Sequence, residues 1–185
     1  MTAILLHERS TPSVGHVLAR YLARCAEADF ALTRIRLAGV DLTGTDLDSV
    51  RRWRVLVGRL DAEAFAHGHA DEDRDAIRRR LATLETFVLS GKLEVRAAGI
   101  AAWAPDFSVL RGLDGKDDDA VTLLGPHYFL APQVTGGPSL TAVFHNGRTA
   151  REAGERFEEL WEKGYDVGAV VAEALSAMRA RVEAR

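Results

Sequence analysis

Hydrophobic and polar positions in the first half of the chain switch between strand-like and helix-like spacing. Short apolar runs that are typical of strands occur at residues 3–6, 29–37 and 54–60. Apolar residues between Val14 and Cys25 recur at helical spacing after a potential capping residue, Ser13. Residues 73–89 form a second amphipathic pattern that stops before Gly91. Successive strand–helix–strand units favour parallel neighbouring strands joined by right-handed crossovers.

The second half carries four more apolar runs and then a long amphipathic helix. The runs lie within residues 92–99, 107–112, 121–129 and 139–147. Their connections are short and hold no helix, so we expect antiparallel pairs among them, with an acidic hairpin tip at residues 113–120. Thr149 is expected to cap the following helix, which bears Trp161 in its apolar stripe. Gly164 should interrupt this helix, and a last helix is expected at residues 167–182.

These elements predict an α/β fold in which a mixed β-sheet is flanked by helices on both faces. A length of 185 residues with 47% hydrophobic residues suits a single domain with a sizeable core. We expect residues 1–166 to form this domain and residues 167–185 to be a C-terminal helical extension of it.

Composition narrows the classes of function. A net charge of -3 argues against broad binding to nucleic acid or anionic membranes, although it leaves room for a local basic patch. The single Cys25 excludes an intrachain disulfide and, in its apolar surroundings, is expected to be buried. No apolar run approaches the roughly 20 residues of a membrane span, and no basic region precedes an apolar one at the N-terminus. A cytoplasmic location is therefore the expectation.

The order of elements in the second half, with Gly125 closing one strand and the Trp161 helix closing the unit, resembles the phospholipase D-like superfamily. The resemblance implies a single-half member, whose relatives pair as dimers to complete an active site. Active members carry the signature HxKxxxxD, in which the His forms a phosphohistidine and the Lys holds phosphate oxygens. A Gly-Ser-x-Asn turn further along the chain completes each half.

This chain lacks that signature. None of its six histidines is followed two residues later by Lys. By element order, the His and Lys positions fall on Asp106 and Ser108, which supply neither an imidazole nor a cation. The four residues of the turn correspond to Gly125, Pro126, His127 and Tyr128. The proline there removes both a hydroxyl and a backbone donor.

The candidate catalytic residues are nonetheless His127, Asp106 and Ser108, because they would share the family's active-site region. His127 would act as a donor, and Tyr128 beside Gly125 would offer a surface for ligand stacking. The alternative is an ordinary turn in which the aromatic side chains pack into the core.

Arg34 and Arg36 are further candidates for ligand binding, because they stand in a strand that should be mostly buried. They either reach solvent or acidic partners at the sheet's edge, or point into the pocket as an anion clamp. Their spacing does not decide between the two.

Other polar groups carry weaker signals. His67 and His69 alone are too few for a zinc site, so we predict no metal and no cofactor. Two groups of arginines occur at positions 51, 52 and 54 and at positions 78–80. Each group could bind nucleic acid or an acidic partner, or it could simply be exposed to solvent. Nearby acidic residues favour the solvated alternative for the second group.

The resemblance and the missing signature together predict a non-catalytic protein. It would act as a homodimer, or as an accessory to a partner in nucleic-acid processing or defence, with direct nucleic-acid binding left open and no membrane partner. The alternatives are a phosphodiesterase or nuclease with an unorthodox site, and a ligand-sensing regulatory domain.

Overall fold

The computed structural model of the chain describes residues 3–7, 14–34, 50–59, 74–98, 106–113, 119–125 and 140–184. Within these ranges the strands are β1 (Ala3–His7), β2 (Glu27–Arg34), β3 (Arg52–Arg59), β4 (Leu93–Ala97), β5 (Phe107–Arg111), β6 (Ala120–Leu124), β7 (Leu140–Phe144) and β8 (Tyr165–Asp166). The helices are α1 (Val14–Leu22), α2 (Arg74–Leu89), α3 (Gly147–Glu162) and α4 (Gly168–Glu183).

All the described strands belong to one mixed sheet with the order β1-β7-β6-β5-β2-β3-β4-β8. β2, β3 and β4 run parallel to one another, and α2 lies between β3 and β4 in the chain, as expected of a strand–helix–strand crossover. β5 is antiparallel to β2 and β6, and β6 is antiparallel to β7. The predicted mixed α/β sheet is therefore confirmed.

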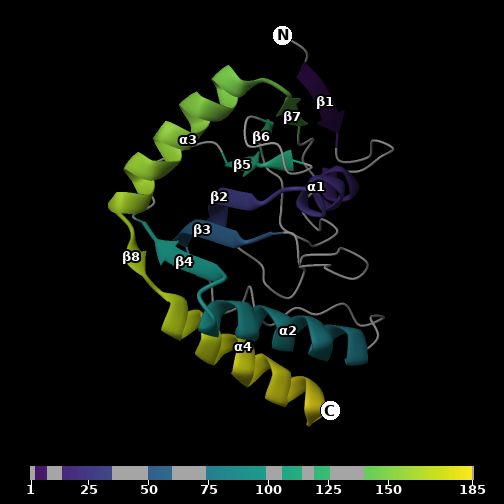
Figure 1. Cartoon of the computed structure of the whole chain (residues 1–185). Coiled ribbons are helices and arrows are strands. Elements are labelled where there is room, and N and C mark those ends of the chain that lie inside the picture. Colours follow the sequence, from purple (N-terminus) through teal and green to yellow (C-terminus); the bar gives the residue numbers. More distant parts are fainter. Residues whose placement is uncertain are drawn as a thin grey trace.

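The helices cover the two faces of the sheet unequally (Figure 1). Residues of α1, α2 and α4 pack with inward side chains such as Phe30 and Trp53 in the larger core cluster. α3 lies alone on the other face, where Phe157 and Trp161 pack against residues of β2, β3 and β5. α2 and α4 lie side by side, and α4 buries Leu175 completely.

Several local predictions change. Asn146, rather than Thr149, caps α3, because its side-chain oxygen accepts a hydrogen bond from the Thr149 N–H at 2.7 Å. The strand expected from residue 54 begins at Arg52, so Arg54 lies inside the sheet. Cys25 follows α1 and is completely buried, as predicted. No helix among the described residues is long and apolar enough to cross a bilayer.

Candidate functional site

The positions that we predicted to correspond to the family's signature meet at one end of the central strands. Asp106 directly precedes β5, and Gly125 directly follows the antiparallel neighbour β6. The Gly125 N–H donates a hydrogen bond to the Asp106 carbonyl at 2.8 Å. Gly125 has a φ of 116°, a conformation that strains residues with a side chain. The structure thus brings together two residues that the sequence placed in the same site.

Asp106 is bound to the end of β2. One of its carboxylate oxygens, Oδ1, accepts hydrogen bonds from the Thr33 N–H at 2.7 Å and from the Thr33 hydroxyl at 2.6 Å. These bonds fasten the start of β5 to the end of β2. A carboxylate in this place also repels a phosphate, whereas the family's imidazole and ammonium would attract one. The residue that we predicted to stand in the nucleophile's position therefore has a structural partner.

Ser108 lies inside the sheet. It is completely buried between Phe30 on β2 and Leu123 on β6, its partners across the two ladders. Its hydroxyl has no hydrogen-bond partner among the described residues. A short buried hydroxyl cannot do what a lysine does, which is to bring a positive charge to phosphate oxygens.

The other candidates are not placed by the structure. His127, Tyr128 and Arg36 lie outside the described residues, as do His67 and His69. Arg34 ends β2 and stands opposite Arg59 in the parallel register with β3, but its side chain lies outside the described part. In the part of the chain that the structure describes, no group of three or more His, Cys, Asp or Glu residues could hold a metal ion.

A cluster of buried charges on the α3 face of the sheet was not predicted. Asp29 on β2 is 1% exposed and receives both Arg54 Nε, at 2.8 Å to Oδ1, and Arg54 Nη2, at 3.0 Å to Oδ2. Arg111 on β5 donates to the same Oδ2 from its Nη1. Asp29 therefore lies between two guanidinium groups from its two neighbouring strands.

The cluster extends into α3 through Glu158. Arg54 donates to its two carboxylate oxygens, with Nη2 at 2.6 Å from Oε1 and Nη1 at 2.9 Å from Oε2. Burial acts to lower the pKa of the Arg54 guanidinium. The hydrogen bonds and charges of Glu158 and Asp29 outweigh burial and raise this pKa above its ordinary value. Arg54 thus stays charged and holds one carboxylate on each side.

Aromatic side chains of α3 contact the guanidinium groups of Arg54 and Arg96. The Arg54 guanidinium carbon lies 4.9 Å from the ring centre of Phe157 and 5.4 Å from that of Trp161. Arg96 on β4 also contacts Trp161. Its guanidinium carbon lies 4.6 Å from the Trp161 ring centre, and its Nη1 donates a hydrogen bond to the Trp161 carbonyl at 2.9 Å. Such cation–π contacts are stronger where water is excluded.

The balance of charges indicates that this cluster has a structural role. Two arginines, Arg54 and Arg111, face two carboxylates, Asp29 and Glu158, so the charges compensate each other. Each guanidinium is already engaged, which suits a tie between α3 and the sheet better than a substrate site. The sequence held a signal for it, since Asp29 and Arg54 each interrupt an apolar strand run. Their pairing partners could not be deduced without the strand order.

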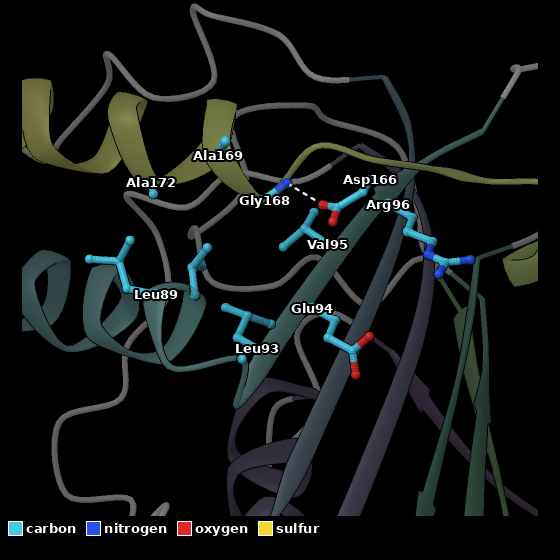
Figure 2. A pocket seen from close by; sticks show the side chains of 11 residues that line it. Leu89, Leu93, Glu94, Val95, Arg96, Asp166, Gly168, Ala169 and Ala172 are labelled. Carbon is cyan, nitrogen blue, oxygen red and sulfur yellow. Dashed lines mark hydrogen bonds between the residues drawn. The ribbon is translucent and has the colours of Figure 1, made fainter.

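A groove opens at the other edge of the sheet, between the end of α2, β4 and the start of α4 (Figure 2). Its volume is about 350 Å³, within the range of small-ligand sites. Leu93 and Val95 lie along β4 at its floor, and Ala169 and Ala172 leave space on the α4 side. The Asp166 carboxylate at its rim accepts a hydrogen bond from the Gly168 N–H at 2.7 Å. The groove is lined by apolar and polar groups in similar measure, and among the described residues it has no pair of groups arranged for catalysis.

Comparisons with known proteins now bear on this arrangement. No family model and no curated protein matches the chain. Solved structures do. Nuc from Salmonella typhimurium, a phospholipase D family member, is 11% identical, with a TM-score of 0.55 over 89% of this chain and 97% of Nuc. NucT from Helicobacter pylori is 9% identical, with a TM-score of 0.56 over 89% and 98% of the two chains. The chain has the phospholipase D-like fold.

A DNA-binding protein shares the phospholipase D-like fold with this chain. TrmBL2, an archaeal chromatin protein with a novel mode of DNA binding, is 13% identical, with a TM-score of 0.54. The match covers 90% of this chain but only 55% of TrmBL2, so this chain spans about half of that protein. At such identities the likeness establishes the fold alone. The fold prediction made from element order is confirmed, whereas activity has to be argued from the residues.

Proposed function

We propose that this chain is a non-catalytic phospholipase D-like protein that works by association, either with itself or with a partner in nucleic-acid processing or defence. The observation that carries the proposal is the state of Asp106. It occupies the nucleophile's position, and its carboxylate is committed to Thr33. Ser108, in the place of the lysine, is buried without a charge to offer. Nuclease and DNA-binding relatives of the same fold support the nucleic-acid context.

The outer strand β1 supports self-association. It lies at the end of the sheet, pairs with β7 on one side, and exposes 47% of Ile4 and 66% of Leu5. Its sequence AILLH contains none of the lysines or prolines that protect an edge strand from pairing with another chain. Two copies joined antiparallel through β1 would continue the sheet across a two-fold axis.

Light scattering on the purified chain tests this association. We expect a dimer, and we expect Leu5→Lys to shift it toward monomer because the lysine would have to be desolvated in the new contact. Val170→Lys is the matched control, since Val170 is an exposed apolar residue on α4, 60% exposed and remote in sequence from β1. A strict monomer at all concentrations would remove self-association and leave the accessory role.

A ligand-sensing domain is the second candidate, favoured by the groove beside β4, whose floor is apolar (Figure 2). Ala172→Leu would fill the groove from α4 while keeping the residue apolar. A thermal-shift screen of small apolar compounds, repeated on Ala172→Leu, tests this candidate. Stabilisation of the parent chain that disappears in the variant is the expected result for a sensor.

A further inference from the structure

The end of the sheet opposite Asp106 carries a row of cationic side chains. The parallel strands β2, β3 and β4 begin at this end, and the helices α1 and α2 that precede β2 and β4 finish there. We use the name basic rim for the cations of this end, which are Arg20, Arg24, Arg51, Arg52 and Lys92.

Backbone hydrogen bonds join the strand starts that carry Arg51, Arg52 and Lys92, while Arg20 lies in the last turn of α1 and Arg24 between α1 and β2. The Arg51 N–H donates to the Ala26 carbonyl at 2.8 Å, which joins the starts of β2 and β3. The Trp53 N–H donates to the Lys92 carbonyl at 2.8 Å, which joins the starts of β3 and β4. Because neighbouring strands are about 4.8 Å apart, the backbone positions of Arg51, Arg52 and Lys92 lie close together.

The rim's charges reach solvent to different degrees. Arg20 and Arg51 are exposed, while Arg52 pairs with Glu27 at 3.1 Å and keeps 43% of its side chain exposed. The Lys92 ammonium lies 4.5 Å from the ring centre of Phe87. The positive charges of the rim also affect the pKa of Tyr21. Burial raises the pKa of this phenol, and the positive charges of Arg20 and Arg24 oppose that rise.

We propose that the basic rim binds the phosphate backbone of nucleic acid. Four of its five members are arginines, whose planar fork matches phosphate oxygens, and a line of cations suits a linear polyanion. The inference rests on the proposed function in one respect, namely that association rather than turnover is this chain's activity. It places the contact at the end of the sheet away from Asp106, so binding does not need the missing catalytic residues.

The described residues on either side of an acidic segment lie at the same end of the sheet as the basic rim. The chain leaves β5 near Leu113 and re-enters the sheet near Asp119, where the Leu113 N–H donates to the Asp119 carbonyl. β5 is the neighbour of β2, so this connection starts and ends at the same end of the sheet as the rim. Its sequence contains Asp114, Asp117 and Asp118. These charges oppose phosphate binding, and their removal should strengthen it.

Fluorescence anisotropy with labelled DNA tests the inference. The probe is a duplex of mixed sequence of about 20 base pairs, titrated in EDTA at salt concentrations from roughly 25 to 200 mM. The parent chain should bind with an affinity that falls steeply with salt. The double variant Arg20→Ala/Arg51→Ala should lower the slope of log affinity against log salt by about 2, one for each lost phosphate contact.

Two further variants make the test specific. Arg78→Ala/Arg79→Ala removes the same charge from exposed positions of α2 and should leave the slope unchanged. Asp117→Asn/Asp118→Asn should tighten binding, and it keeps the inference testable if the rim variant fails to fold, as judged by circular dichroism.

Binding that is absent at low salt, or equally weakened by the two arginine pairs, would overturn the inference. The inference would also be overturned if the chain bound polyglutamate but not DNA and this binding depended on Arg20 and Arg51. The basic rim would then bind an acidic protein. If the chain cleaved the labelled DNA and its binding still depended on the basic rim, the proposed function would be contradicted and the inference would stand.

Discussion

At the scale of single residues, the charges that the structure describes are engaged with one another. Asp106 and Ser108 stand where we predict the family's imidazole and ammonium to lie; Asp106 is bonded to Thr33, and Ser108 is buried. On the opposite side of β2, Arg54 has two carboxylate partners, Asp29 and Glu158. A buried arginine without a partner would strongly destabilise the fold. Once it is paired with carboxylates, its charge is compensated and no longer available to a substrate. The charges inside this domain therefore serve its cohesion.

Arg54→Met tests that conclusion. The substitution leaves Asp29 with a buried charge that only Arg111 compensates, so we expect a loss of about 3 to 5 kcal/mol in the free energy of unfolding. Arg52→Met, two residues earlier on the same face of β3, breaks a pair whose side chains are 43% and 34% exposed. It should cost less than about 1 kcal/mol. Urea denaturation gives both values, and equal losses would mean that the buried cluster contributes no more than a surface pair.

Cys25 gives a prediction of pH dependence. Burial raises the pKa of this thiol from 9.0 to about 12. The unfolded chain therefore loses the thiol proton at lower pH than the folded chain does. The stability linked to the proton is fully present below about pH 9 and is lost as the pH rises toward 12. Between these values the parent chain should lose about 1.4 kcal/mol per pH unit more than Cys25→Ala does. Parallel pH curves for the two proteins would contradict the assignment.

At the scale of elements, α3 connects β7, next to one edge of the sheet, with the strand β8 at the other edge. Its start is fixed by Asn146 directly after β7, and its middle is tied to the sheet through Glu158, Phe157 and Trp161. The capping prediction failed because Thr149 and Glu152 have the spacing of a capping box, whereas the helix begins two residues before Thr149. Glu152 instead pairs with Arg148 at 2.9 Å.

Substitutions at the two proposed capping residues distinguish them. Asn146→Ala removes the acceptor for the Thr149 N–H and should destabilise the protein by about 1 kcal/mol. Thr149→Ala should change stability by a few tenths of a kcal/mol, because its side chain then caps nothing and alanine is the better helix former. Thermal unfolding monitored by circular dichroism compares the two. A larger loss for Thr149→Ala would return the cap to that residue.

The sequence predicted most elements because their hydrophobic spacing is strong. β3 and β5 are compact apolar runs, and α2 has a clear apolar face, so periodicity was sufficient. The charge cluster could not be predicted, since Asp29, Arg54 and Arg111 lie far apart in the chain and meet only in the order β5-β2-β3. Of the candidate site, the contact between Asp106 and Gly125 followed from element order, while the bond to Thr33 depends on local geometry that spacing does not carry.

At the scale of the whole molecule, the two ends of the sheet differ in character. One end holds Asp106 and Gly125, where the fold's catalytic groups would stand, and the other holds the basic rim. In the function that we propose, the domain acts through surfaces of this kind rather than through reactive groups. The exposed β1 edge and the basic rim are separate from Asp106, so association and binding can be altered without touching that position. This separation makes each proposal testable by itself.

Hydrolysis of bis-p-nitrophenyl phosphate by the purified chain is the most direct test of the central claim that the fold is retained without its chemistry. We expect a rate equal to that of buffer, and the same rate for His127→Ala and Asp106→Ala. Turnover by the parent chain that either substitution abolishes would show a working active site at this end of the sheet and would contradict the account.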